Sequence, residues 1–105
     1  MEEPNLSYIH SLSGGDKDFE KKIIDVLKME FPEEKALYFK NFTEGNLTLA
    51  AANVHKIRSK ISLLGFEKGH AIATLFERNL FEGETTLCDE FENVLNNISN
   101  CLSTI

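Results

Sequence analysis

The chain has 105 residues and a mass of 11.9 kDa, the size of a single domain. Hydrophobic residues make up 42% of it and aromatic residues 10%, which is typical of a globular protein and excludes a disordered tail or a fibrous repeat. Eleven Lys and Arg stand against 17 Asp and Glu, and the net charge of −6 argues against a general nucleic-acid binder.

No apolar run approaches the ~18 residues that a membrane span requires. The acidic start, residues 1–4, is followed by no apolar stretch, so it does not resemble a signal peptide. Cys88 and Cys101 fall on one predicted helix, about 20 Å apart, which is too far for a disulfide. We therefore expect a cytoplasmic, reduced protein with no membrane partner.

The first part of the chain predicts two or three helical segments. One or two helical turns are expected over residues 5–13, closed by Gly14 and Gly15. Asp16 is a plausible N-cap for the next helix. The apolar residues of that helix recur every three or four positions, as on one buried face; they are Phe19, Ile23, Val26, Leu27 and Phe31. Because Pro32 would cost a helix interior ~3 kcal/mol, we expect a break or a kink there, followed by a helix through residue 42.

Three further helices are predicted in the second half of the chain. Asn46 is a plausible cap for the first of them, which ends at Gly65, a natural residue for the left-handed turn behind a helix. The next helix is expected over residues 67–81. Thr85 or Thr86 can cap the last one, which carries apolar residues at helical spacing to the end of the chain.

These elements predict the fold class. No stretch alternates with a period of two residues, and no Asn-Gly or Asp-Gly turn indicates a hairpin. We expect one all-α domain over residues 1–105: an antiparallel four-helix bundle over residues 16–102, with an additional short helix in the N-terminal segment, residues 1–15.

His55 is the one histidine with an organised neighbourhood. It lies at the edge of the buried face of its predicted helix, and small side chains and a guanidinium lie within two turns on the same face. These neighbours are Ala51, Ala52, Arg58, Ser59 and Ser62. An accessible imidazole beside a fixed cation suits an incoming anion.

The local charge points in the same direction. No acidic residue lies between Glu44 and Glu67, whereas Lys56, Arg58 and Lys60 place three positive charges there. A phosphoryl group could be bound on this helix. By themselves these features fit equally well a solvated basic face with a structurally idle histidine.

One segment resembles the active-site helix of histidine-containing phosphotransfer (HPt) domains: residues 53–65, NVHKIRSKISLLG. In that family a His is followed by a basic residue three positions on, a small residue four positions on and a Gly ten positions on. The corresponding residues here are His55, Arg58, Ser59 and Gly65.

The resemblance extends over about residues 16–100. The family's helix break, its turn before the active-site helix, and the Leu-Glu or Leu-Gln pair on the next helix correspond to Phe31-Pro32-Glu33, Glu44-Gly45-Asn46 and Phe76-Glu77. Two positions depart from the commonest pattern, since Arg58 is most often Lys in the family and the position of Glu77 is often Gln.

The resemblance implies a phosphocarrier of a multistep two-component phosphorelay. His55 would accept a phosphoryl group from an aspartyl phosphate on a response-regulator receiver domain and pass it to another receiver, with a hybrid histidine kinase as a further partner. Arg58 and Ser59 would assist at the site. Glu77 would either accept a hydrogen bond from the imidazole and orient it, or repel the phosphoryl group. The receiver would dock over Ala51, Ala52, Lys56, Lys60 and Ser62.

The resemblance also implies which groups the chain does without. In this family the Mg²⁺ belongs to the receiver, so no metal or cofactor is expected in this chain. No Gly-rich phosphate-binding loop is present, so we expect a phosphotransfer intermediate rather than a kinase that uses ATP. Isolated domains of the family are mostly monomers, and a monomer is expected here.

Two alternatives remain open. One is a degenerate HPt-like module that binds a receiver without carrying phosphate; loss of the histidine would be its mark, and His55 is present. The other is a metal-binding helical bundle that uses His10, His55 and His70 with carboxylates. Bundle metal sites favour repeated Glu-x-x-His pairs, and only Glu67 with His70 fits that spacing.

Overall fold

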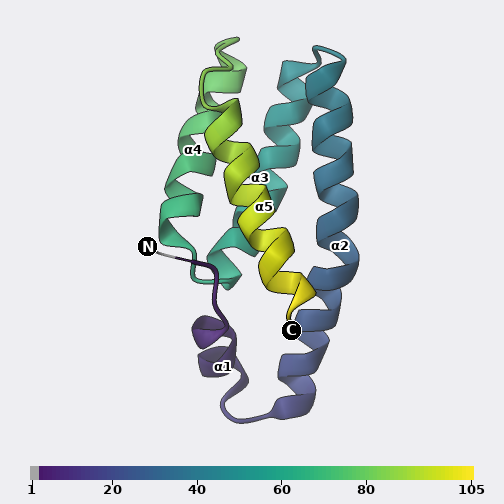
Figure 1. Cartoon of the computed structure of the whole chain (residues 1–105), viewed down its shortest axis with the longest axis vertical. Coiled ribbons are helices and arrows are strands. Elements are labelled where there is room, and N and C mark those ends of the chain that lie inside the picture. The colour runs from purple at the N-terminus through teal and green to yellow at the C-terminus, as the bar shows by residue number, and fades with distance from the viewer. Residues whose placement is uncertain (1–2) are drawn as a thin grey trace.

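The computed structural model describes residues 3–105, which contain five helices, joined by short turns, and no strand. Met1 and Glu2, the first residues of the predicted N-terminal segment, lie outside the described residues. The helices are α1 (Ser7–Ser13), α2 (Lys17–Thr43), α3 (Leu47–Leu63), α4 (Glu67–Phe81) and α5 (Cys88–Ser103), as shown in Figure 1. The predicted all-α class is confirmed.

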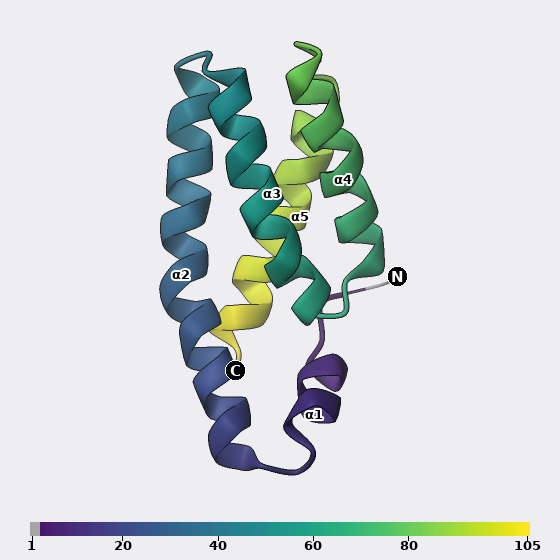
Figure 2. The same cartoon turned by 180° about the vertical axis from the view of Figure 1, so that it is seen from behind.

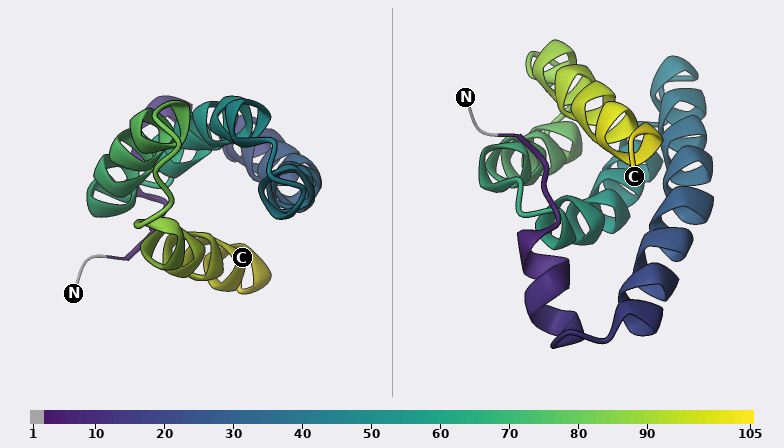
Figure 3. Two further views of the ribbon diagram at one scale, coloured as in Figure 1. Left: turned by 90° about the horizontal axis from the view of Figure 1, so that it is seen from above. Right: turned by 60° about the horizontal axis from the view of Figure 1, so that its bottom comes forward.

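The helices pack around one hydrophobic core. α2, α3 and α4 run alternately up and down and lie side by side (Figures 1 and 2). Seen from above they form an arc, and α5 lies across its open side (Figure 3). The middle helix of the arc, α3, packs against both α2 and α4. Within residues 3–105, no helix is both long enough and apolar enough to cross a lipid bilayer.

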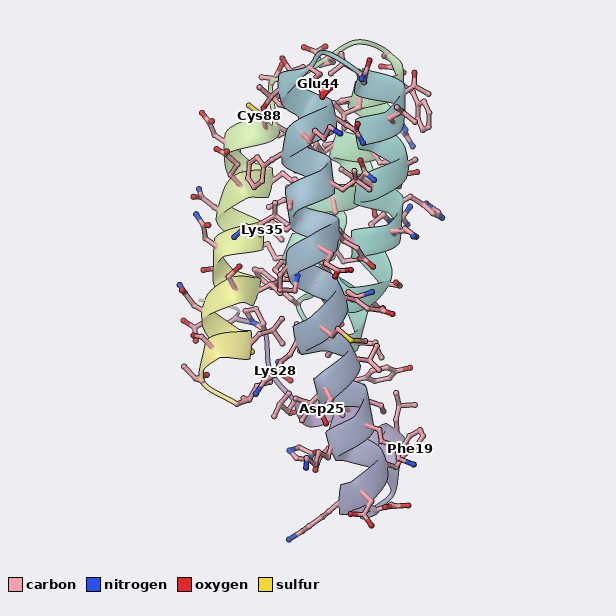
Figure 4. The ribbon with its side chains drawn as sticks, turned by 90° about the vertical axis from the view of Figure 1, so that its right-hand side faces the viewer. Phe19, Asp25, Lys28, Lys35, Glu44 and Cys88 are labelled. Carbon is pink, nitrogen blue, oxygen red and sulfur yellow. The ribbon has the colours of Figure 1, made fainter. Side chains whose placement is uncertain are left out.

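Aromatic side chains fill a large part of this core. Tyr38 lies at the centre, and its ring centroid is 5.0 Å from that of Phe91 and 6.2 Å from that of Phe76, both in edge-on contacts. All three side chains are buried. Burial raises the pKa of the Tyr38 phenol, because desolvation disfavours tyrosinate. Phe19, which was predicted to face the core, is instead 47% exposed, since its part of α2 extends beyond the other long helices (Figure 4).

α2 is one helix of 27 residues that continues through Pro32, so the predicted break is wrong. Pro32 is exposed and cannot donate a hydrogen bond to the carbonyl of Lys28, but the loss is confined to that turn. Phe31 and Tyr38 are buried on either side of it, and this tertiary packing outweighs the local preference. The predicted cap at Asp16 is confirmed, because its carboxylate accepts from the backbone N–H groups of residues 18 and 19, each at 3.1 Å.

The other predicted caps differ from the structure. The Asn46 side chain makes no capping hydrogen bond to α3. α5 begins at Cys88 behind Leu87, and the hydroxyl of Thr86 donates instead to the Glu84 carboxylate at 2.6 Å. Gly65 does end α3 as predicted, with a φ of 64° in the left-handed region that favours glycine.

α1 closes the lower end of the core. Ile9 is completely buried, and the backbone N–H of Asn5 donates to the carbonyl of Leu64 at 2.7 Å. α1 lies beside the N-terminal part of α2, to which it is joined by a short turn (Figure 1). The short helix predicted for this segment is therefore confirmed, and its apolar side is part of the core.

Gly69 on α4 provides a test of how tightly this end of the fold is packed. A Cβ atom at this position would lie 2.6 Å from Cδ2 of Phe66, whose ring is itself buried. Gly69→Ala gains about 1 kcal/mol of helix propensity, but overpacking costs about 1–3 kcal/mol. We expect a net loss of up to about 2 kcal/mol in the free energy of unfolding, measured by urea denaturation. An increase in stability would show that the Phe66 ring moves aside freely.

Candidate functional site

The site is centred on His55, an exposed residue near the middle of α3, the helix that Figure 2 shows beside α4. The imidazole is 69% exposed. Its Nδ1 atom lies 3.2 Å from both carboxylate oxygens of Glu77, which α4 places opposite it. The structure therefore brings together the two residues that the sequence placed on separate helices.

This contact selects one tautomer of the ring. An ionised carboxylate can only accept hydrogen bonds, so the proton of a neutral imidazole is held on Nδ1, which donates to Glu77. The lone pair then resides on Nε2. An exposed ring with its free lone pair on Nε2 is a nucleophile held in a defined orientation.

Arg58 holds the carboxylate from the other side. Its Nη1 atom donates to Oε1 of Glu77 at 2.9 Å, and the two side chains are 26% and 17% exposed. Glu77 thus links the imidazole and the guanidinium in one cluster. The charge of Arg58 is therefore already paired, and the guanidinium is not a free binding site for an anion. Its Nε–H is buried and has no hydrogen-bond partner within residues 3–105.

Lys60 does not lie on the predicted docking surface. Its ammonium donates to Glu34 at 2.8 Å and to Glu30 at 2.9 Å, both on α2, and its side chain is 11% exposed. Burial lowers the pKa of Lys60, but hydrogen bonds to the two carboxylates outweigh burial, and the net pKa is raised. The expectation that a receiver docks over Lys60 is therefore corrected. Lys60 links α3 to α2, because its carboxylate partners come from the neighbouring helix and not from its own.

A substitution at Lys60 tests this structural role. Lys60→Met keeps most of the apolar stem but leaves the partly buried Glu34 without its cation. We expect a loss of about 2–3 kcal/mol in the free energy of unfolding, less than for a fully buried pair because Glu30 is half exposed. The matched control, Lys56→Met on the exposed side of the same helix, should change stability by less than about 0.5 kcal/mol. Equal effects in urea denaturation would contradict the assignment.

The remaining predicted surface residues separate into two groups. Ala52, Lys56, Ser59 and Ser62 are exposed on α3, in line with their expected place around the imidazole. The Ser59 hydroxyl donates to the carbonyl of Lys56 at 2.9 Å. Ala51 is completely buried in the core and offers no surface to a partner, which corrects that expectation.

Phe81 lies on the same face of α4 as Glu77, one turn further on, and sequence reasoning missed it. Its side chain is 60% exposed, unusual for a phenylalanine. In the sequence it adjoins Leu80, which is buried, so hydrophobicity alone could not tell which of the two faces the core. The four-residue spacing from Glu77 was the available signal.

The other titratable groups of interest do not belong to the cluster of His55, Glu77 and Arg58. Among residues 3–105, no three His, Cys, Asp or Glu side chains gather in a way that could hold a metal ion. His10 contacts Glu20 between α1 and α2, and His70 lies on α4. Cys88 and Cys101 are both free thiols, and burial raises the pKa of each.

Comparisons of the chain with protein-family models, with curated proteins and with solved structures gave no significant match.

Proposed function

We propose that this protein is an HPt-like phosphocarrier that accepts a phosphoryl group on His55 from the aspartyl phosphate of a receiver domain and passes it to another receiver. The observation that carries the proposal is an exposed imidazole whose Nδ1 is held by Glu77, so that Nε2 is free to react. The proposal places the protein in the cytoplasm, as one step of a two-component phosphorelay that a hybrid histidine kinase supplies.

The arrangement of the helices supports this reading. The proposal interprets α2 to α5 as the antiparallel four-helix bundle of an HPt domain and α1 as an additional helix. His55 lies near the middle of α3, the helix at the centre of the arc, where both neighbouring helices can supply side chains to it. The residues that resemble the family motif, Arg58, Ser59 and Glu77, all lie within about two turns of it on α3 or opposite it on α4.

The chemical step uses groups that are already in place. The lone pair of Nε2 attacks the phosphorus of the aspartyl phosphate in line with the P–O bond to the aspartate. An N–P bond forms, that P–O bond breaks, and the aspartate leaves as a carboxylate. Nδ1–H continues to donate to Glu77, which stabilises the positive charge that develops on the ring. The receiver supplies the Mg²⁺, and the same steps in reverse pass the group onward.

The proposal gives Arg58 a positioning role. Its guanidinium fixes Glu77 at 2.9 Å and offsets the negative charge that would otherwise face the incoming phosphoryl group. The buried Nε–H remains available as a further donor if the cluster rearranges on phosphorylation.

The receiver is proposed to dock on the surface around the imidazole. The exposed residues there on α3 are small or hydroxylated, apart from Lys56, so they leave the ring accessible. Phe81 adds an exposed aromatic ring to the edge of this surface, the kind of side chain that anchors protein interfaces.

A second candidate is the degenerate module that binds a receiver without accepting phosphate. It is favoured by the Glu77 carboxylate, which lies 3.2 Å from the ring and would repel a phosphoryl group held nearby. The two candidates differ in covalent chemistry, so one experiment separates them.

The deciding experiment incubates the protein with phosphorus-labelled receiver domains from the same genome. We expect label that is acid-labile and alkali-stable to appear on the protein, and NMR to place the phosphorus on Nε2 of His55. A receiver that binds but never transfers label would support the degenerate module. Phosphate found on Nδ1 would contradict the tautomer that the Glu77 contact selects.

A further inference from the structure

A groove of about 550 Å³ lies between the middle of α2 and the last turns of α5. Its floor is apolar, because Phe31 and Leu102 are buried there and Phe39 is partly buried. The volume lies within the range of sites that bind ligands or partner side chains. Its other lining residues are Lys28, Pro32, Lys35, Ala36, Ser99 and Ser103.

The rim of this groove is positively charged in an acidic protein. Lys28 and Lys35 extend from α2 on the side of α5 (Figure 4) and are two helical turns apart, or about 10 Å along the axis. Lys35 donates to the Ser99 hydroxyl at 3.0 Å, and Lys28 donates to a terminal backbone oxygen of Ile105, which offsets part of its charge. Within residues 3–105, neither ammonium pairs with a carboxylate side chain, and no acidic residue lines the groove.

Neither helix places an acidic side chain in the lining of the groove. α5 carries no charged residue after Glu92, so its groove side is neutral. On α2 the nearest acid below Lys28 on the lysine side is Asp25, which does not line the groove (Figure 4).

We propose that this groove binds an amphipathic helix of a partner protein, whose apolar face covers Phe31, Phe39 and Leu102 and whose two acidic residues, two turns apart, pair with Lys28 and Lys35. A groove between two helices with an apolar floor is the usual seat for such a helix. The two lysines argue for this occupant, because their separation matches two carboxylates on one helix. An amphiphile with a single anionic head would engage only one of them.

The groove and the His55 surface can be occupied at the same time. The groove is lined by residues of α2 and α5 only, whereas His55, Arg58 and Glu77 lie on α3 and α4 and none of them lines it. The second surface therefore does not depend on phosphotransfer, and its test can fail while the proposed function holds.

The test uses a synthetic peptide of about four helical turns, with Leu at helical spacing on one face and two Glu seven positions apart beside it. The control peptide carries Lys in place of both Glu. Fluorescence anisotropy gives the Kd, and chemical-shift changes in NMR spectra of the full chain locate the site. We expect the acidic peptide to bind at least about tenfold more tightly and to shift the amides of Phe31, Ser99 and Leu102.

Two variants make the assignment specific. Lys28→Glu with Lys35→Glu should weaken binding of the acidic peptide by about tenfold or more, through lost attraction and added repulsion. Lys21→Glu with Lys40→Glu changes the net charge by the same amount at exposed positions of α2 outside the groove, and should have a much smaller effect. Ala36→Trp, which fills the groove without changing its charge, should also reduce binding.

Several outcomes overturn the proposal. They are equal affinity for the two peptides, equal effects of the two double variants, shifts confined to α3 and α4, and no binding of the acidic peptide at about 1 mM. Displacement of the peptide by dodecanoate at micromolar concentration would replace the helical occupant with a lipid.

Discussion

Replacement of His55 by Gln should abolish acceptance of the phosphoryl group. Glutamine keeps the polarity and much of the length of the side chain but has no nucleophilic ring nitrogen, so the N–P bond cannot form. Because the His55 side chain is 69% exposed, we expect the free energy of unfolding to change by less than about 0.5 kcal/mol. The measurement is transfer of label from receiver domains, with circular dichroism and urea denaturation on the same samples.

His70 provides the matched control for this variant. It lies on α4 and is absent from the His55 cluster, so His70→Gln should transfer label as the unmodified chain does. Label that is acid-labile and persists in His55→Gln would show that another histidine accepts the phosphoryl group. A large loss of stability in His55→Gln would leave its loss of transfer uninterpretable, and for that case His55→Asn is a second variant with the same chemical deficit.

Substitution of Glu77 should separate its two possible roles, which the sequence left open. Glu77→Ala removes the acceptor for Nδ1–H, and we expect acceptance of the phosphoryl group to slow by about 10–100-fold, by analogy with the loss of carboxylates that orient metal-ligating histidines. Glu77→Gln keeps an oxygen acceptor and removes the negative charge. It should retain most of the forward rate and lengthen the lifetime of the phosphohistidine, because repulsion is removed and Arg58 is released toward the phosphoryl group.

The measurements are the rate of label acquisition and the rate of its loss, determined separately for each variant. Glu82→Gln, at the end of the same helix and exposed, is the control and should change neither rate. If Glu77→Gln slows acquisition as much as Glu77→Ala does, the charge of Glu77 matters more than its hydrogen bond. If both variants acquire label faster than the unmodified chain, Glu77 acts mainly by repulsion.

Most of the fold could be predicted from the sequence, because amphipathic spacing and glycines define the helices. The bounds expected for α4, residues 67–81, agree with Glu67–Phe81 in the structure. The errors at Pro32 and Phe19 share one physical cause, which is that the tertiary surroundings of a residue are not contained in its local sequence. Pro32 lies inside α2 because buried aromatic residues hold the turns around it, and Phe19 is exposed because that end of α2 has few neighbours.

The candidate site could be predicted only in part. His55, Arg58 and Glu77 were expected to act together, and the structure brings them within hydrogen-bonding distance. The charge of the helix could not be predicted from its own residues. Its segment is free of acids in the sequence, yet Glu77 from α4 neutralises Arg58, and two acids from α2 neutralise Lys60. Counting charges along one segment of the sequence leaves out the carboxylates that neighbouring helices bring to it in the fold.

The buried Tyr38 gives the protein an optical reporter of its own unfolding. The chain has no tryptophan and only two tyrosines, of which Tyr8 is half exposed. Because the pKa of Tyr38 is raised in the fold, its neutral form contributes stability that is present below the ordinary tyrosine pKa of 10.0 and is lost as the pH rises toward the folded value. Alkaline conditions therefore lower the free energy of unfolding through Tyr38 itself. The later rise in ultraviolet absorbance from the Tyr38 tyrosinate, after that from the half-exposed Tyr8, reports the opening of the core without any added dye.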